Sequence, residues 1–288
     1  MIGAKAPAKI NLFFEVGPKR ADGYHSVISI YQSLELFEEV YVEPAPSWSV
    51  SVSGNLSQQQ LDLVPLDQTN LVVKAALALA SHVGIENPQP MHFNILKQVP
   101  SAGGVAGGSA DAAAALVALN EAWCLGLSRS ELAQVAAKIG ADIPFALLGG
   151  TALGVDSGIE LASLPAADNR HVLLVFSSPG LSTGRVFEAF DDLYPEGDIT
   201  KSPGEFLAGF DLADAGKNSL LDAALVLRPD LRGLIDAVPN SAKLSGSGPT
   251  LYLLSESLDE LSDWQSKYAD LGLESLITRF GNSGAELI

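Results

Sequence analysis

The stretch PSAGGVAGGSADAAAA, residues 100–115, runs from a glycine-rich loop directly into an alanine-rich helix. Its glycines have no Cβ, so the backbone can approach a polyphosphate closely and point consecutive amides at the phosphate oxygens. These glycines are Gly103, Gly104, Gly107 and Gly108. We expect Ser109 at the N-cap of the helix, where the first amides lack intrahelical acceptors and the helix dipole stabilises an anion. The stretch therefore predicts a phosphate-binding loop.

The same spacing also fits an ordinary glycine turn in front of a helix, and the stretch alone does not decide between the two. It does exclude two familiar nucleotide motifs. A P-loop needs Lys and then Ser or Thr directly after its last glycine, whereas Gly108 is followed by Ser109 and Ala110. A dinucleotide-binding fingerprint needs Gly-x-Gly-x-x-Gly, and no window over residues 103–108 has this spacing. Any nucleotide at this loop is therefore held in another way.

The composition is that of a globular chain with a large core. The 288 residues are 47% hydrophobic, and the length favours two domains. Stretches such as residues 143–155 are too short and too glycine-rich to span a bilayer, and residues 1–16 place charge where a signal peptide is apolar. Cys124 is the only cysteine, and the four histidines are too scattered for a zinc motif. We expect a cytoplasmic protein with no membrane partner.

The chain is strongly acidic, with 17 Lys and Arg against 34 Asp and Glu and a formal net charge of −17. Binding to nucleic acid depends on neutralising phosphates, so we expect no nucleic-acid partner. This charge repels an anionic substrate at long range, and a phosphate site then needs cations gathered locally. Candidates for such cations are Lys9, Lys19, Arg20 and Lys97.

In the first half of the chain, predicted strands and helices alternate. Apolar residues at every second position predict a strand over residues 10–16, which ends in a turn or hairpin loop. We expect a second strand over residues 25–36 and another over residues 91–96, which leads into the glycine loop. Between them, Asn70 caps a helix whose apolar residues recur at helical spacing over residues 71–83.

After the alanine-rich helix, Ser128 and Glu131 form a capping box in front of a helix that stops at Gly140. Asp142 follows at once and opens a short apolar helix, in which Pro144 is favoured because its missing N–H would lack a partner anyway. The local sequence favours Asp142 as a simple N-cap. The alternative is a carboxylate held rigidly beside the phosphate loop.

The second half also mixes strands and helices. We expect strands over residues 171–176, 250–254 and 274–279, and helices over residues 182–193, 218–227 and 258–268. Residues 195–216 are the most loop-like part of the chain. A second glycine element, KLSGSGPT at residues 243–250, suits a tight turn beside a strand and is by itself a weak sign of a ligand contact.

Three separated segments agree with one family. They are APAKINLFFEVGPKRADGYHSV at residues 6–27, VPSAGGVAGGSADAAAALVALN at residues 99–120 and KLSGSGPTLY at residues 243–252. Together they resemble the galactose, homoserine, mevalonate and phosphomevalonate (GHMP) kinase superfamily, and the resemblance covers nearly the whole chain. It implies an α+β, two-domain GHMP-kinase-like fold. The implied domains are an N-terminal ribosomal-protein-S5-domain-2-like domain that binds ATP, over residues 1–160, and a C-terminal ferredoxin-like domain beside the substrate cleft, over residues 161–288.

Within the superfamily, KINL at residues 9–12, RADGYH at residues 20–25 and GADIPF at residues 140–145 resemble one branch. Its acceptor is a small molecule, a cytidine diphosphate derivative of methylerythritol, whose 2-hydroxyl is phosphorylated with ATP and Mg²⁺ in the non-mevalonate isoprenoid pathway. The resemblance implies that Asp142 accepts the hydroxyl proton, while Lys9 holds the carboxylate and the developing negative charge.

The resemblance also assigns two ligand sites. Asn11, Tyr24 and His25 would hold the cytidine end of the acceptor, with an aromatic ring stacked on cytosine. Phe187 or Phe190 would supply the opposite face. The implied ATP contacts are Asn70, Lys97, Pro100, Ser101, Ala102, Gly103, Gly104, Val105, Ala106, Gly107, Gly108, Ser109 and Ala110. No residue is assigned to the metal.

Ala102, Ala106 and Ala110 stand where the family usually has glycine, glycine and a second hydroxyl residue. Alanine disfavours positive φ, so we expect ordinary backbone conformations there, and Ala110 has no hydroxyl for phosphate or metal. Two alternatives stay open: another kinase of the superfamily, of the homoserine or mevalonate type, or a catalytically silent metabolite sensor. The RADGYH segment argues against the first, and the presence of both a lysine and a candidate base argues against the second. We expect a monomer or a weak homodimer.

Overall fold

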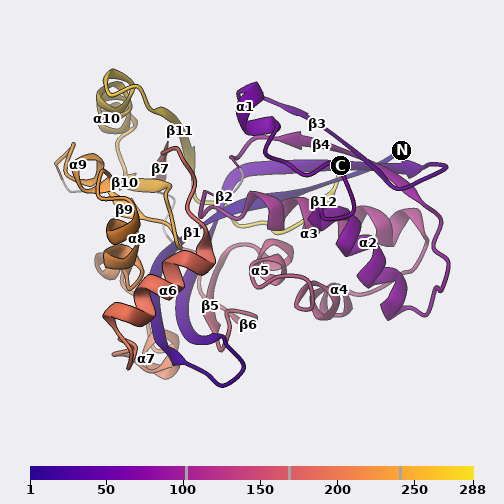
Figure 1. Cartoon of the computed structure of the whole chain (residues 1–288), viewed down its shortest axis with the longest axis horizontal. Coiled ribbons are helices and arrows are strands. Elements are labelled where there is room, and N and C mark those ends of the chain that lie inside the picture. Colours follow the sequence, from indigo (N-terminus) through magenta and orange to yellow (C-terminus); the bar gives the residue numbers. More distant parts are fainter. Residues whose placement is uncertain (101–102, 168–169, 240–241) are drawn as a thin grey trace.

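The computed structural model describes residues 1–100, 103–167, 170–239 and 242–288. Two β-sheets form the framework, a larger one built mainly from the first half of the chain and a four-stranded one from the second half (Figure 1). The order in the larger sheet is β12-β1-β2-β4-β3, whose strands span Glu286–Leu287, Ile2–Lys19, His25–Pro44, Met91–Lys97 and Ser49–Gly54. The prediction of a mixed α and β fold is confirmed.

Three further strands join the larger sheet beside this path. β5 (Thr151–Val155) pairs with β2 and with β6 (Glu160–Ser163), and both pairings are antiparallel. β8 (Lys217–Asn218) pairs in parallel with β1. Strand β1 is therefore contacted by a segment from the second half of the chain.

β1 and β2 form a long antiparallel hairpin, and both strands are longer than predicted. Residues 2–8 belong to β1 as well, because Ala4 and Ala6 pack against the helix layer; their small side chains give only a weak periodic signal. Pairing is irregular on both sides of the segment from Lys9 to Asn11. Such irregularities bend a strand and re-aim its side chains, and these two residues line the cavity described below.

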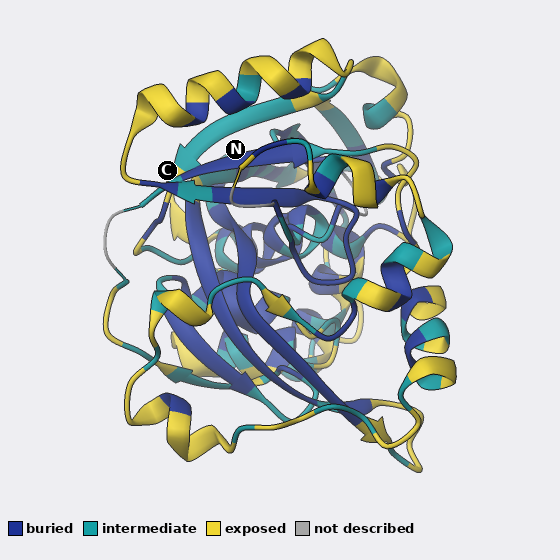
Figure 2. Ribbon diagram, turned by 90° about the vertical axis from the view of Figure 1, so that its left-hand side faces the viewer, coloured by how far each residue is buried: buried dark blue, intermediate teal, exposed yellow. Residues whose placement is uncertain are grey.

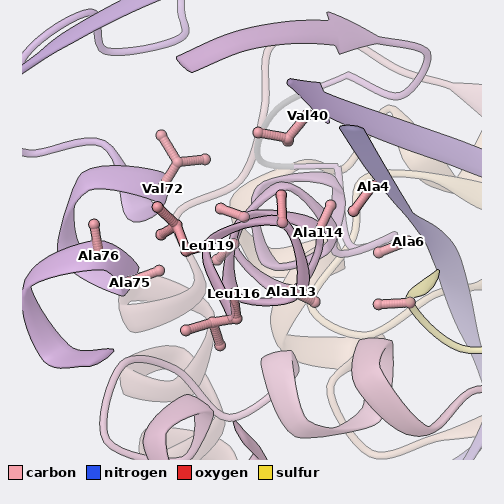
Figure 3. Packing of buried hydrophobic residues seen from close by; sticks show 14 of the residues in the cluster. Ala4, Ala6, Val40, Val72, Ala75, Ala76, Ala113, Ala114, Leu116 and Leu119 are labelled. Atoms are coloured by element: carbon pink, nitrogen blue, oxygen red, sulfur yellow. The ribbon is translucent and has the colours of Figure 1, made fainter. Parts of the chain in front are cut away.

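The alanine-rich helix α3 (Gly107–Ala122) packs on β1, β2 and helix α2 (Leu71–His82). Figure 3 shows Ala114 on the side of the strands and Leu119 toward α2, at the centre of the buried cluster. Since alanine occupies most of the buried positions, α3 can lie close to the sheet without leaving voids. The helix thus fixes the position of the glycine loop that precedes it.

Three shorter helices complete the first half of the chain: α1 (Gln58–Leu61), α4 (Arg129–Ala136) and α5 (Ile143–Leu148). The capping box of Ser128 and Glu131 is confirmed, since both reciprocal hydrogen bonds are present. The regular part of α4 ends at Ala136, and only turns continue to Gly140, which corrects the predicted helix end.

The smaller sheet has the antiparallel order β11-β7-β10-β9, from Glu274–Arg279, His171–Phe176, Leu251–Ser255 and Lys243–Leu244. Its helices are α6 (Thr183–Leu193), α7 (Pro203–Leu207), α8 (Leu221–Leu227), α9 (Leu231–Ile235) and α10 (Leu258–Asp270). The strand over residues 171–176 and the strand over residues 274–279 have the predicted bounds. The helix predicted over residues 218–227 begins only at Leu221, because Lys217 and Asn218 pair with β1.

The loop-like prediction for residues 195–216 is partly wrong, since this region contains α7 and a short 3₁₀ helix, Leu212–Asp214. It is tied to the hairpin through Glu15 of β1, which is fully buried. The Glu15 carboxylate accepts hydrogen bonds from the backbone and hydroxyl of Thr200 and pairs with Lys217. These donors hold the pKa of the Glu15 carboxyl below its usual range, against the opposing effect of burial.

The two halves of the molecule meet along β1 and β2. The strands crossing the middle of Figure 2 are almost entirely buried, whereas the surrounding helices expose one side. Ile10 and Leu12 of β1 share a core cluster with Val172 and Leu174 of β7. β12 returns to pair with β1, so the last described strand belongs to the first sheet. The domain boundary at residue 160 stays a prediction.

None of the helices among the described residues is long and apolar enough to cross a membrane.

Candidate active site

A cavity of about 650 Å³ lies where the glycine loop, the β1–β2 hairpin and α6 come together. The sequence-predicted residues that line it come from all three segments and from the start of α5. They are Lys9, Asn11, Tyr24, His25, Gly103, Gly104, Ala106, Gly107, Gly108, Ser109, Asp142 and Phe187. Most of the predicted catalytic and substrate contacts are therefore brought to one place.

The glycine loop enters α3 through a left-handed residue. The N-cap is Ala106, with φ 60° and ψ 31°, so the prediction of Ser109 as N-cap is wrong. Ser109 lies in the first turn instead and lines the cavity. The expectation of an ordinary conformation at Ala106 is also wrong: the tight entry into the helix requires positive φ at this point, and the packing of α3 outweighs the preference of alanine.

The first amides of α3 face the cavity end of the helix. An α-helix leaves its first amides without intrahelical acceptors, and here the first backbone bond is that from Ala110 N to Ala106 O, at 2.9 Å. The amides of Gly107, Gly108 and Ser109 precede it, and all three residues line the cavity. The helix thus presents a set of donors and the positive end of its dipole to an anion.

Gly104 has a conformation and a position that only glycine allows. Its φ is +80°, and a Cβ at this position would lie 2.2 Å from the carbonyl oxygen of Ser245. The Ser245 hydroxyl in turn donates to the Gly104 carbonyl at 2.9 Å. The second glycine element, residues 243–250, therefore packs directly on the phosphate loop, which its own sequence indicated only weakly.

Lys9 is held by groups from three segments. Its Nζ donates to Asn11 Oδ1 at 2.6 Å and to the Gly104 carbonyl at 3.3 Å, and lies 3.6 Å from Asp142 Oδ2. Only 5% of the Lys9 side chain is exposed, compared with 32% of the Asp142 side chain. The ammonium is therefore fixed between the strand, the loop and the carboxylate, while the carboxylate stays accessible from the cavity.

Asp142 occupies the N-cap position of α5, as its local sequence predicts, but its side chain makes no capping hydrogen bond. The carboxylate lies beside Lys9 and lines the cavity instead. The alternative, a carboxylate beside the phosphate loop, is the arrangement in the structure.

The hairpin places Tyr24 and His25 differently. Tyr24 lines the cavity and is 66% exposed, whereas the His25 ring is buried. The His25 Nδ1–H donates to the Gly17 carbonyl at 2.9 Å, since a carbonyl can only accept. The Phe187 ring lies 5.0 Å from the His25 ring, measured between centroids. Phe190 is fully buried, so of the two phenylalanines considered, Phe187 is the one that faces the cavity.

Two predicted ATP contacts point elsewhere. Asn70 accepts from Val72 N and donates to the Pro65 carbonyl, so its side chain caps α2 as the sequence also allowed. It is not among the residues that line the cavity. The contact prediction for Asn70 is not supported by this geometry.

Lys97 is completely buried and is not among the residues that line the cavity, so its contact with ATP stays a prediction that the position of its side chain does not support. Its ammonium lies 3.0 Å from Glu38 Oε1 and 2.8 Å from Asp111 Oδ2. Burial, together with the charge of Asp111, raises the pKa of Glu38 to about 8, and burial likewise raises that of Asp111. A Cβ on Gly107 would lie 3.2 Å from both Lys97 Nζ and Glu38 Oε1, so this buried network supports the loop from behind.

The remaining predicted ATP contacts are residues that are buried or residues that the structure does not describe. Val105 is buried in the core, and its carbonyl accepts from Lys9 N at 3.1 Å. Pro100 is buried, and Ala110 is buried with its N–H used inside α3. Ser101 and Ala102 lie outside the described residues.

Comparison with known proteins identifies the family. The family model for the GHMP kinases N terminal domain matches residues 70–150. A 4-diphosphocytidyl-2-C-methyl-D-erythritol kinase from Nocardioides sp. is 40% identical over 296 residues, covering 99% of each chain. The enzyme of the same name from Nocardia farcinica is 42% identical over 267 residues, covering 88% of this chain and 85% of the relative. The chain belongs to the 4-diphosphocytidyl-2-C-methyl-D-erythritol kinase family.

Solved structures agree with this assignment. A crystal structure of a 4-(cytidine 5′-diphospho)-2C-methyl-D-erythritol kinase matches with a TM-score of 0.75 and 27% identity, covering 97% of this chain and 99% of that one. A homoserine kinase from Cytophaga hutchinsonii matches with a TM-score of 0.70 at 18% identity, covering 100% of this chain and 97% of that one, which shows the shared fold alone. The chain therefore has the GHMP kinase fold.

Tyr31 is one of the residues that line the cavity of this 4-diphosphocytidyl-2-C-methyl-D-erythritol kinase family member and that sequence reasoning missed. The Tyr31 ring lines the cavity, stacks on Phe145 at 5.0 Å and lies 5.6 Å from the Lys9 ammonium. Burial, with a contribution from the charge of Asp142, raises the pKa of the Tyr31 phenol, so it keeps its proton. Its only sequence signal was its place on the neighbouring strand, where it pairs with Asn11.

Proposed function

We propose that this chain transfers the γ-phosphoryl group of ATP to the 2-hydroxyl of 4-diphosphocytidyl-2-C-methyl-D-erythritol, giving the 2-phosphate and ADP. The observation that carries the proposal is the Lys9–Asp142 pair, with 3.6 Å between Nζ and Oδ2, in one cavity with the glycine loop and the Tyr24–His25 turn. A nucleotide loop, a base and an aromatic edge for cytosine are the three parts that this reaction needs. The reaction belongs to the non-mevalonate isoprenoid pathway.

The catalytic step needs a base that can reach the acceptor hydroxyl. The 2-hydroxyl oxygen forms a bond to the γ-phosphorus, the bond to the β–γ bridging oxygen breaks, and ADP leaves with that electron pair. The hydroxyl proton passes to the Asp142 carboxylate, which faces the cavity. Lys9 keeps the carboxylate in place, and a positioned base of this kind contributes about 10²–10⁴ in rate. Asn11 and the Gly104 carbonyl fix the Lys9 ammonium.

The glycine loop fits the ATP phosphates. Gly104 and Ala106 have positive φ, and they and the first residues of α3 line the cavity. The backbone N–H groups there can donate to phosphate oxygens without intervening side chains. No group of three His, Cys, Asp or Glu residues that could hold a metal ion occurs within the described ranges. Mg²⁺ typically keeps several waters and is held largely by substrate phosphates, so the Ser109 hydroxyl would be a protein partner for it and the Asp142 carboxylate would stay free to act as the base. Bound there, Mg²⁺ would neutralise charge on the phosphates.

The cytidine end of the acceptor fits between the hairpin turn and α6. Tyr24 and Phe187 offer aromatic faces, and stacking of a base on such a ring contributes about 1–3 kcal/mol. His25 and Asn11 also line the cavity. A fixed set of donors and acceptors can then distinguish cytosine from uracil.

We further propose the finer organisation of the chain. Residues 1–160 would form the S5-domain-2-like ATP-binding domain, and residues 161–288 a ferredoxin-like domain around the four-stranded sheet. We propose a cytoplasmic enzyme that acts as a monomer or weak homodimer. Size-exclusion chromatography with light scattering at two protein concentrations tests the oligomeric state.

The decisive experiment is a coupled ADP-release assay with Mg-ATP and one acceptor at a time. The acceptors are 4-diphosphocytidyl-2-C-methyl-D-erythritol, homoserine and mevalonate, and phosphorus NMR identifies the product. Turnover with the cytidine compound alone supports the proposal. Turnover with homoserine or mevalonate instead assigns another branch of the superfamily, and ATP binding without turnover of any acceptor assigns a sensor.

A further inference from the structure

Asp191, near the end of α6, contacts two residues of the β1–β2 hairpin. Its Oδ1 lies 3.2 Å from His25 Nε2, and its Oδ2 accepts from Lys19 Nζ at 2.9 Å. Lys19 and His25 are themselves paired across the two strands. One carboxylate from the second half of the chain therefore holds both strands of the hairpin, next to the turn that carries Tyr24.

The same helix carries the aromatic wall of the cavity. Phe187 precedes Asp191 by four residues, so the two side chains lie on one face of α6. The Phe187 ring lies 5.0 Å from the His25 ring, and the Phe190 ring meets the same imidazole edge-on at 6.1 Å. The contact of Asp191 with His25 thus fixes how far Phe187 stands from the hairpin.

Contacts on three sides fix the orientation of the His25 ring. Its Nδ1 donates to the Gly17 carbonyl, one face meets Phe187, and Nε2 faces the Asp191 carboxylate. Only 5% of the His25 side chain is exposed. A ring in this position behaves as a spacer between the hairpin and α6.

Asp191 is not among the residues that line the cavity, so a ligand there would not touch it. We propose that Asp191 is a positioning residue that sets the width of the cytosine slot between Tyr24 and Phe187. The inference rests on the proposed function, because it assumes a cytidine acceptor. It goes beyond that function because Asp191, which does not line the cavity, would affect how tightly the acceptor binds.

The test compares Asp191→Ala, Asp191→Asn and the matched control Asp192→Ala, whose side chain is exposed on the same helix. Values of kcat and of KM for each substrate are measured on the full chain, with thermal unfolding alongside. We expect Asp191→Ala to raise the KM for the cytidine acceptor about tenfold, to leave the ATP KM within about twofold and to change kcat little. The single oxygen of Asn can still accept from Lys19 while its amide group donates to His25 Nε2, so Asp191→Asn recovers most of the affinity.

A double-mutant cycle with Phe187→Ala tests the route of the effect. If Asp191 acts through the position of Phe187, removing Asp191 has little further effect on acceptor KM once Phe187 is gone. Equal changes in both KM values, a loss of kcat alone, or full additivity with Phe187→Ala overturns the inference. Failure of the proposed function is seen separately, in the wild-type chain, as an absence of turnover with the cytidine acceptor.

Discussion

Lys9 on β1 and Asp142 at the start of α5 meet with 3.6 Å between the ammonium nitrogen and the carboxylate oxygen Oδ2. The ammonium also bonds the carbonyl of Gly104 in the phosphate loop. The same lysine therefore contacts both the proposed base and the glycine loop, an arrangement that would bring the acceptor hydroxyl and the γ-phosphate next to each other. Alignment of this kind is the main requirement of phosphoryl transfer.

Asp142→Asn should lower kcat by about 10²-fold or more, because the amide cannot take the proton of the acceptor hydroxyl. ATP affinity should change little, since the loop amides do not depend on this side chain. Steady-state kinetics and calorimetric titration with ATP measure the two quantities. Asp263→Asn, on the exposed side of α10, serves as the control, and a variant with wild-type turnover would remove Asp142 from the mechanism.

Tyr24→Ala should raise the KM for the cytidine acceptor by about 5–150-fold, which corresponds to the loss of about 1–3 kcal/mol of stacking. The KM for ATP should stay nearly constant, because Tyr24 lies on the hairpin turn and not on the phosphate loop. Tyr24→Phe keeps the ring and should behave almost as wild type. Equal effects of Tyr24→Ala on both substrates would mean that the ring only supports the turn.

Gly104→Ala should destabilise the fold by at least about 2 kcal/mol and weaken ATP binding, because the added methyl group meets the Ser245 carbonyl and φ is positive. Gly108→Ala is the matched comparison for stability. Its Cβ would meet only Leu71 Cδ1, at 3.5 Å, and alanine favours the helix, so its unfolding temperature should not fall. Chemical unfolding of both variants measures the difference, and similar losses in the two would contradict the assigned loop geometry.

The buried network of Glu38, Lys97 and Asp111 should make stability depend on pH. The folded chain raises the pKa of Glu38 from 4.5 to about 8, so it binds this proton more tightly than the unfolded chain does. The unfolding free energy should therefore fall as the pH rises from about 4.5 to about 8 and then level off. The raised pKa of Asp111 acts in the same direction.

Asp111→Asn provides the test of this dependence. It removes the neighbouring charge that helps to raise the pKa of Glu38, and its amide oxygen can still accept from Lys97. Urea unfolding between pH 5 and pH 9 should then show a flatter profile than that of the wild type. The exposed control Asp263→Asn should keep the wild-type slope, and an unchanged slope in Asp111→Asn would argue against the network as its source.

The local patterns predicted most elements because propensity, caps and apolar spacing agreed. Asn70 and Ser128 are examples, because each caps its helix through residues close in sequence. The predictions that differ from the structure concern features that long-range packing determines. Ala106 takes a left-handed conformation because α3 is fixed on the sheet, and the interior position of Lys97 depends on Glu38, a residue of another strand.

The residues of the site fall into the same two groups, those marked by a local motif and those placed by long-range packing. Lys9, Asp142 and the Tyr24–His25 turn belong to motifs that the family resemblance marks, and the structure brings them to one cavity. Tyr31 and Asp191 carry no motif of their own, and their contacts arise from strand pairing and from the position of α6. No local pattern could have shown that Ser245 packs on the phosphate loop.

The pairing of β12 with β1, described above, bears on how the chain folds during synthesis. A ribosome makes the hairpin that carries Lys9 long before it makes Phe280, which bridges to Leu34, or Glu286, which pairs with Lys5. Until then one edge of the nascent sheet has no neighbour, and an uncovered edge is where chains aggregate. The hairpin that carries Lys9 is therefore made well before the strand that covers its edge, and it is among the last parts to be protected.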